Sequence, residues 1–99
     1  MLQSAPRGRT TQVTVVTAAR CHLCEDARQA LAGLGHDYQL MVREVAADDP
    51  AGQALVLRHR AGLFPLVLVD GAFFSAGRLP RRKLARLLAQ QRALAAAGR

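Results

Sequence analysis

Residues 13–35 read VTVVTAARCHLCEDARQALAGLG, and the first part of this stretch differs in pattern from the rest. The β-branched run at 13–17 predicts a short buried strand. From Cys24 the chain has an acidic first turn and then glycines where a helix would end. Apolar residues recur there at helical spacing, at Ala27, Leu31 and Leu34. Cys21 and Cys24 therefore stand where a strand gives way to a helix.

A thiol at this junction suits redox chemistry. Only an ionised, accessible thiolate attacks a disulfide, and the first turn of a helix offers unpaired N–H groups and the positive end of the helix dipole. Arg20 and His22 flank Cys21, and cationic neighbours favour the thiolate, although the same dipole disfavours a charged His22. Cys24 lies a turn further in, on the apolar side. We therefore expect Cys21 to be exposed and Cys24 shielded, with Arg20 and His22 as modulating residues.

Two other interpretations of the cysteine pair stay open at this stage. In the first interpretation, Cys24 is an ordinary core residue and Cys21 an incidental surface thiol. In the second, the pair supplies half of a tetrahedral zinc site. His36 and His59 are isolated in the sequence, so a zinc site would need ligands from another molecule. We therefore expect no metal.

After the first helix the sequence predicts a second strand and a second helix. Tyr38, Leu40 and Val42 alternate with Gln39, Met41 and Arg43, which is the period of a strand. Asp49 is a typical N-cap, and Pro50 suits the first helical position that follows it. Gly62 predicts the end of this helix.

The last third of the chain predicts a hairpin followed by a helix. An apolar run at 66–69 and a segment at 72–75 flank Asp70-Gly71, a strong signal for a tight turn between paired strands. Pro80 predicts the start of the final helix. One side of that helix carries Leu84, Leu87, Leu88 and Gln91.

A chain of 99 residues with 51% hydrophobic residues has room for one compact α/β core. We expect the order βαβαββα in one domain at 12–95, between a flexible tail at 1–11 and a short tail at 96–99. No stretch approaches the roughly 18 apolar residues of a membrane helix, and residues 1–12 hold no apolar block typical of a signal peptide. We therefore expect a cytoplasmic protein with no membrane partner. In that reducing compartment a cysteine pair is more often catalytic, redox-sensing or metal-binding than a permanent structural disulfide.

Charge is distributed unevenly along the chain. The formal net charge is +7, and residues 78–99 include seven basic residues and no acidic one. The final helix therefore has a basic face, which attracts acidic proteins, anionic lipid or nucleic acid. Nearly all of the positive residues are arginines in an Ala- and Leu-rich sequence, as a general compositional bias would produce, and this argues against a nucleic-acid partner.

Three motifs stand out within the predicted order of elements. They are Cys21-His22-Leu23-Cys24 with Glu25 and Asp26, Phe64-Pro65 with the strand and turn that follow, and Ser75-Ala76-Gly77-Arg78. With these motifs the chain resembles the thioredoxin fold, and in particular glutaredoxin-like proteins with a Cys-His-Leu-Cys signature. The resemblance covers about residues 12–95, and it implies a four-stranded mixed sheet flanked by helices.

The resemblance also implies roles for individual residues. Cys21 would be the nucleophile and Cys24 the resolving thiol of a small dithiol–disulfide oxidoreductase. Pro65 would be a cis proline that faces the dithiol and exposes the Phe64 backbone to an extended substrate. The alternative from the residues alone is a trans proline that begins a strand.

Glutathione is the small partner and reductant that the resemblance implies, with no cofactor bound. Glutaredoxins usually hold it with paired glycines followed by an acid, whereas here Gly77 is followed by Arg78 and no acid comes after. The backbone at Gly77 and the following helix tip would still hold one carboxylate. Arg58 or Arg60 would bind the other, and the alternative is that both are solvated charges at the end of a helix. Apolar Phe64 favours a disulfide-bearing protein as the partner.

A competing class of function is a non-enzymatic binding module or redox sensor. In that case the fold is retained, and the basic final helix docks an acidic partner. Salt-sensitive binding without turnover would support this alternative.

Overall fold

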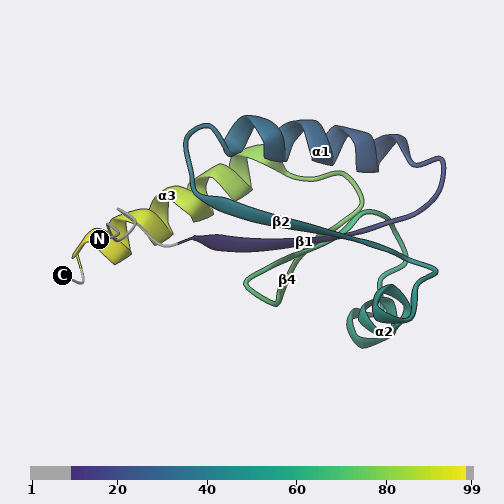
Figure 1. Cartoon of the computed structure of the whole chain (residues 1–99). Helices are drawn as coiled ribbons and strands as arrows, with labels where there is room; N and C mark the ends of the chain where they lie inside the picture. Colours follow the sequence, from purple (N-terminus) through teal and green to yellow (C-terminus); the bar gives the residue numbers. More distant parts are fainter. Residues whose placement is uncertain (1–9, 98–99) are drawn as a thin grey trace, which may run out of the picture.

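The computed structural model describes residues 10–97. It has one four-stranded sheet with helices packed against it (Figure 1). The elements follow the predicted order. They are β1 (Thr11–Thr17), α1 (His22–Leu34), β2 (Leu40–Ala46), α2 (Pro50–His59), β3 (Leu66–Val69), β4 (Ala72–Ala76) and α3 (Arg81–Ala97). The order βαβαββα is therefore confirmed.

The sheet is mixed, with the spatial order β2-β1-β3-β4. Strand β2 runs parallel to β1, β3 runs antiparallel to β1, and β4 runs antiparallel to β3. The register pairs Val16 with Leu66, and Leu66 with Ala76. Because of this register, the end of β1, the beginning of β3 and the end of β4 meet at one end of the sheet. The dithiol follows β1 at that same end.

Helices cover both faces of the sheet, with α1 and α3 on one face and α2 on the other (Figure 1). The larger core cluster combines β1 and β3 with Ala27 and Leu31 of α1 and with Leu84 of α3. A smaller cluster on the α2 side is formed by Val16, Leu66 and Leu68. Every residue of β3 is buried, because this inner strand is covered on both faces.

Helix α3 packs by the side that the sequence predicts. Leu84 and Leu88 are buried, and Leu87 and Gln91 are half-buried. The Thr11 hydroxyl also donates a hydrogen bond to Oε1 of Gln91 over 3.1 Å, which joins the first strand to the last helix. This side of α3 therefore completes the core.

The ends of the ordered elements extend beyond the predicted domain. Thr11 is buried in β1 and donates its N–H to the Gln39 carbonyl oxygen, so it is part of the strand and not of a tail. Helix α3 runs through Ala97, which makes positions 96 and 97 helical. The predicted tails at 1–9 and 98–99 lie outside the described residues.

Helix α2 starts as predicted and ends differently. Asp49 is the N-cap and Pro50 the first residue, although the Asp49 side chain makes no capping hydrogen bond. The helix ends at His59, and Arg60 takes the left-handed conformation with φ 51°, so the prediction that Gly62 ends it is wrong. The Arg60 N–H closes the last turn on carbonyl oxygens of α2, so an arginine occupies the place where glycine is usual.

The hairpin is confirmed. Asp70 and Gly71 both have positive φ, 50° and 84°, as a two-residue type I′ turn requires. The Asp70 carboxylate also accepts a hydrogen bond from the Gln12 N–H over 3.0 Å. The turn is thereby attached to β1 as well as to its own two strands.

Candidate functional site

Cys21 is the N-cap residue of α1. Its backbone is extended, with φ −109° and ψ 104°, and its Sγ accepts a hydrogen bond from the Cys24 N–H over 3.1 Å. The Cys21 carbonyl oxygen accepts the Glu25 N–H, which begins the helical ladder. The sulfur thus occupies the position of the oxygen in an ordinary Ser or Asp cap. Because of this cap, α1 begins at His22, two residues before the start that the apolar pattern predicts.

The two cysteines form a disulfide, and their Cα atoms are 5.2 Å apart, within the usual range for such a bond. Cys24 is 1% exposed, whereas Cys21 is only half-buried. The prediction of one accessible and one shielded sulfur is confirmed. The structure is therefore that of the oxidised protein, and one end of its disulfide can be reached from solvent.

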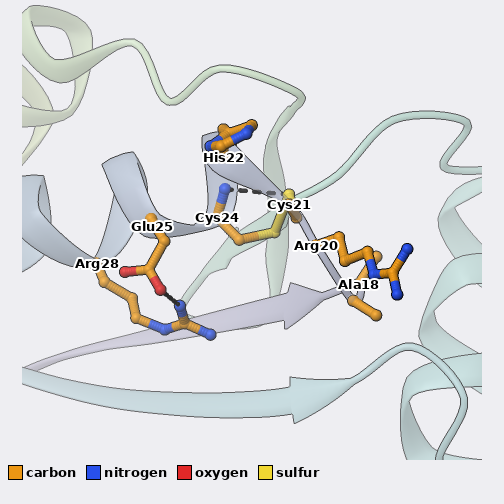
Figure 2. A pocket seen from close by; sticks show the side chains of 8 residues that line it. Ala18, Arg20, Cys21, His22, Cys24, Glu25 and Arg28 are labelled. Carbon is orange, nitrogen blue, oxygen red and sulfur yellow. Dashed lines mark hydrogen bonds and ion pairs between the residues drawn. A yellow bond between two sulfur atoms is a disulfide. The ribbon is translucent and has the colours of Figure 1, made fainter.

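A cavity of about 650 Å³ lies next to the disulfide, between the loop before α1 and the first turns of that helix (Figure 2). Arg28 forms one wall and bridges two carboxylates, Glu25 over 2.9 Å and Glu44 of β2 over 2.8 Å. The hydrogen bond with Glu44 raises the pKa of the Arg28 guanidinium, which is charged in any case. This bridge fixes the beginning of α1 against β2.

The two cationic neighbours of Cys21 have less direct positions than the sequence suggests. Arg20 and His22 are exposed, and in Figure 2 both side chains point away from the sulfurs. Arg20 has φ 55°, a left-handed conformation that is unfavourable for a residue with a Cβ atom. Strain of this kind occurs preferentially at functional sites. Here it turns the chain sharply from β1 into α1.

The Phe64-Pro65 peptide bond is cis, as the resemblance predicts. Pro65 is buried at the beginning of β3, and its carbonyl oxygen accepts the Gly77 N–H over 3.1 Å. The register of the sheet places this corner at the same end as the dithiol. Three predicted site segments, at Cys21, Phe64-Pro65 and Gly77, therefore meet at one end of the molecule.

One expectation about this corner needs correction. The Gly77 N–H is bonded to Pro65, so it does not serve as the expected donor for a carboxylate. Phe64 is half-buried and packs against the α2 side of the core, and its role toward a partner stays a prediction. Arg58 and Arg60 are exposed at the end of α2, and neither lines the cavity beside the disulfide.

Leu63 is the apolar residue that the sequence reasoning missed. Its side chain is 63% exposed, and a Cβ atom placed on Gly77 would lie 3.3 Å from its Cδ1. Gly77 has φ 95°, so it accepts both the left-handed backbone and the close approach of Leu63. The signal was present in the sequence as an apolar residue in the loop directly before Phe64-Pro65.

Residues 10–97 contain neither a cluster of metal ligands nor a membrane-spanning helix. In this part of the chain, no three His, Cys, Asp or Glu side chains gather closely enough to hold a metal ion. No helix in the same part is long and apolar enough to span a bilayer.

Comparisons with known proteins establish the fold. No protein-family model matches the chain, and neither does any curated protein sequence. Among solved structures, a thioredoxin-like protein from Clostridium perfringens aligns with a TM-score of 0.67 at 10% identity, over 83% of this chain and 71% of that one. Thioredoxin O2 from Arabidopsis thaliana in the oxidised state aligns with 0.61 at 17% identity, over 81% and 73%. A mutant thioredoxin from Halobacterium salinarum aligns with 0.60 at 18% identity, over 82% and 74%.

The chain therefore has the thioredoxin fold, with a Cys-x-x-Cys disulfide between β1 and α1. At these identities the likeness establishes the fold alone. The narrower resemblance to glutaredoxin-like proteins stays a prediction.

Proposed function

We propose that this protein is a small thiol–disulfide oxidoreductase. The observation that carries the proposal is the unequal disulfide: Cys21 is half-buried and caps a helix, whereas Cys24 is 1% exposed. A permanent structural disulfide has no need for one accessible sulfur at a helix N-terminus. This arrangement suits a pair that exchanges with another disulfide.

In the first step the reduced protein attacks its substrate. The Cys21 thiolate forms a bond to one sulfur of the substrate disulfide, the substrate S–S bond breaks, and the other substrate sulfur leaves as a thiolate. The Cys24 N–H, which points at the Cys21 sulfur, stabilises the thiolate before the attack. The beginning of α1 adds the favourable dipole.

In the second step Cys24 resolves the mixed disulfide. Its thiol loses a proton, its sulfur bonds to Cys21, and the second substrate thiolate is released. The product is the Cys21–Cys24 disulfide seen in the structure. The substrate disulfide is reduced by two electrons, and the protein dithiol is oxidised by two. A thiol reductant, for which we propose glutathione, returns the pair to the dithiol.

The test uses a matched pair of variants, because the chain has only two cysteines. Cys21→Ser and Cys24→Ser both lack the disulfide, so both suffer any loss of stability that follows from its absence. We expect Cys21→Ser to reduce a model protein disulfide no faster than the thiol reductant of the assay does without the protein. Cys24→Ser should accumulate a mixed disulfide that intact mass spectrometry detects.

The opposite result would favour the binding module. If both thiols of the wild type alkylate in every glutathione redox buffer, no reversible couple exists and the proposal fails. A reversible couple with a glutathione adduct on Cys24→Ser would identify glutathione as a reductant. If the disulfide forms reversibly but only a dithiol reductant returns it to two thiols, glutathione is excluded as the reductant.

A further inference from the structure

A second cavity, of about 510 Å³, lies where the chain enters α3. Five cationic side chains line it together with Leu79, Pro80 and Asp26, and we call it the basic cavity. Five cations against one carboxylate leave it with a net charge of +4. All five cations are exposed. They are Arg78, Arg81, Arg82, Lys83 and Arg86.

Most of this charge has no acidic partner among the residues that the structure describes. Arg81 is paired with Asp26 of α1, and the Lys83 ammonium lies 5.3 Å from the centre of the Phe74 ring. Among residues 10–97, no carboxylate forms an ion pair with Arg78, Arg82 or Arg86. Their guanidinium groups are therefore available to an external anion.

The basic cavity is unfavourable for α3 itself. The first turn of α3 has no acidic residue, and it carries Arg81, Arg82 and Lys83. Cations there are repelled by the positive end of the helix dipole, which an anion would offset. By contrast, the first turn of α1 contains Glu25. The charge at the beginning of α3 is thus better suited to a bound anion than to the stability of the helix.

The basic cavity is a neighbour of the dithiol. Asp26, which forms part of its lining, lies two residues after Cys24 in the first turns of α1. Arg78 directly follows Gly77, which is bonded to Pro65 of the cis proline corner. A polypeptide that presents a disulfide to Cys21 can therefore extend over the basic cavity.

We propose that the basic cavity docks an acidic polypeptide segment of the protein whose disulfide Cys21 attacks. This inference rests on the proposed function and adds a class of substrate to it. Arginine forks bind carboxylates in bidentate fashion. The cations occur within nine residues of sequence and have no exposed aromatic ring among them to stack a base, which favours a polypeptide over a nucleic acid.

The experiment compares two peptides of equal length, each with the same disulfide. One has an acidic flank of Asp and Glu, and the other has Asn and Gln at the same positions. Their reduction is measured for the wild type, for the double variant Arg82→Gln with Arg86→Gln, and for the control Arg43→Gln. Arg43 is an exposed cation on β2, next to Glu44, which faces α1, so its side chain lies on the other face of the sheet.

We expect the wild type and Arg43→Gln to prefer the acidic peptide by about 5- to 10-fold in kcat/KM at low salt, through KM. The double variant and high salt should remove this preference and leave the neutral peptide unaffected. Equal rates for both peptides in the wild type would overturn the inference while the proposed function stands.

A binding measurement distinguishes failure of the proposed oxidoreductase function from failure of the proposed docking at the basic cavity. If neither peptide is reduced, the proposed function fails. Fluorescence anisotropy of the labelled acidic peptide with the oxidised protein then decides about docking: salt-sensitive binding that depends on Arg82 supports it, and no binding overturns it. Tighter binding of a single-stranded DNA of equal charge would overturn it in favour of a nucleic-acid partner.

Discussion

Helices α1 and α3 cover the same face of the sheet (Figure 1), yet their first turns differ in charge. Helix α1 begins with a sulfur cap at Cys21 and has Glu25 in its first turn. Helix α3 begins with Arg81, Arg82 and Lys83 and has no acid there. Both dipoles favour a negative group. The first turn of α1 has its own, whereas the start of α3 has only Asp26 of α1, which pairs with Arg81. Helix α1 thus starts with a negative group of its own, whereas α3 starts with an excess of positive charge, on which the proposed docking of an acidic segment depends.

The largest expected effect comes from breaking the α1 side of this comparison at Cys21. Ser is a good N-cap and Ala is a poor one, while neither is a thiolate. We expect Cys21→Ser and Cys21→Ala to be equally inactive in disulfide reduction. Under reducing conditions, Cys21→Ala should unfold about 1 kcal/mol more easily than Cys21→Ser. Urea denaturation measures this difference, and equal stability would mean that a capping side chain at position 21 contributes nothing to the stability of α1.

The start of α2 differs from the other two helix starts, because close packing of the backbone matters more there than charge. A Cβ atom on Gly52 would overlap the carbonyl oxygen of Ala46, so Gly52→Ala must displace α2 from the end of β2. We expect a loss of roughly 1–3 kcal/mol in the free energy of unfolding. The matched control is Gly33→Ala in α1, where nothing lies within 4 Å, and it should gain about 0.5–1 kcal/mol. Similar values for the two variants would contradict this reading of α2.

The sequence was sufficient for the elements of the fold whose signals are local. The alternation in β2, the apolar run of β3, the Asp70-Gly71 turn and the apolar side of α3 each depend on residues close together in the chain. Burial of Cys24 beside the accessible Cys21 followed from the same local pattern. Each of these elements is present in the structure. The alternation predicted for β2 is not seen in its burial, because Val42 is exposed like its neighbour Met41, and the strand runs from Leu40 to Ala46.

What the sequence did not predict depends on contacts between distant segments. The bond between Gly77 and Pro65 requires the register of β3 and β4, and the exposure of Leu63 depends on the same packing. The left-handed conformation of Arg60, which ends α2, was not predicted because glycine is the usual residue at such a position. The basic cavity was anticipated as a charged helix face, but its position beside Asp26 of α1 was not.

A smaller effect is expected at the α3 side when its first turn is given an acid. Arg82→Glu should raise the free energy of unfolding by about 0.3–1 kcal/mol, because the carboxylate interacts favourably with the helix dipole. The control Arg86→Glu lies beyond the first turn and should change stability less. Both variants should lose preference for an acidic substrate. A destabilised Arg82→Glu would show that the cations at this helix start already have a favourable environment.

The smallest effect is expected from His22, although it stands between the two cysteines. Its side chain is exposed and points away from the sulfurs, so water screens its charge from Cys21 (Figure 2). In a Cys24→Ser background, His22→Ala should lower the thiolate fraction of Cys21 at neutral pH by no more than about twofold, the scale of an exposed charge pair. Ultraviolet absorbance of the thiolate measures it, and Arg20→Ala is the matched neighbour. A much larger change would mean that the imidazole moves toward Cys21 once the disulfide is reduced. The thiolate at the start of α1 would then be stabilised by a side chain as well as by the backbone of the helix.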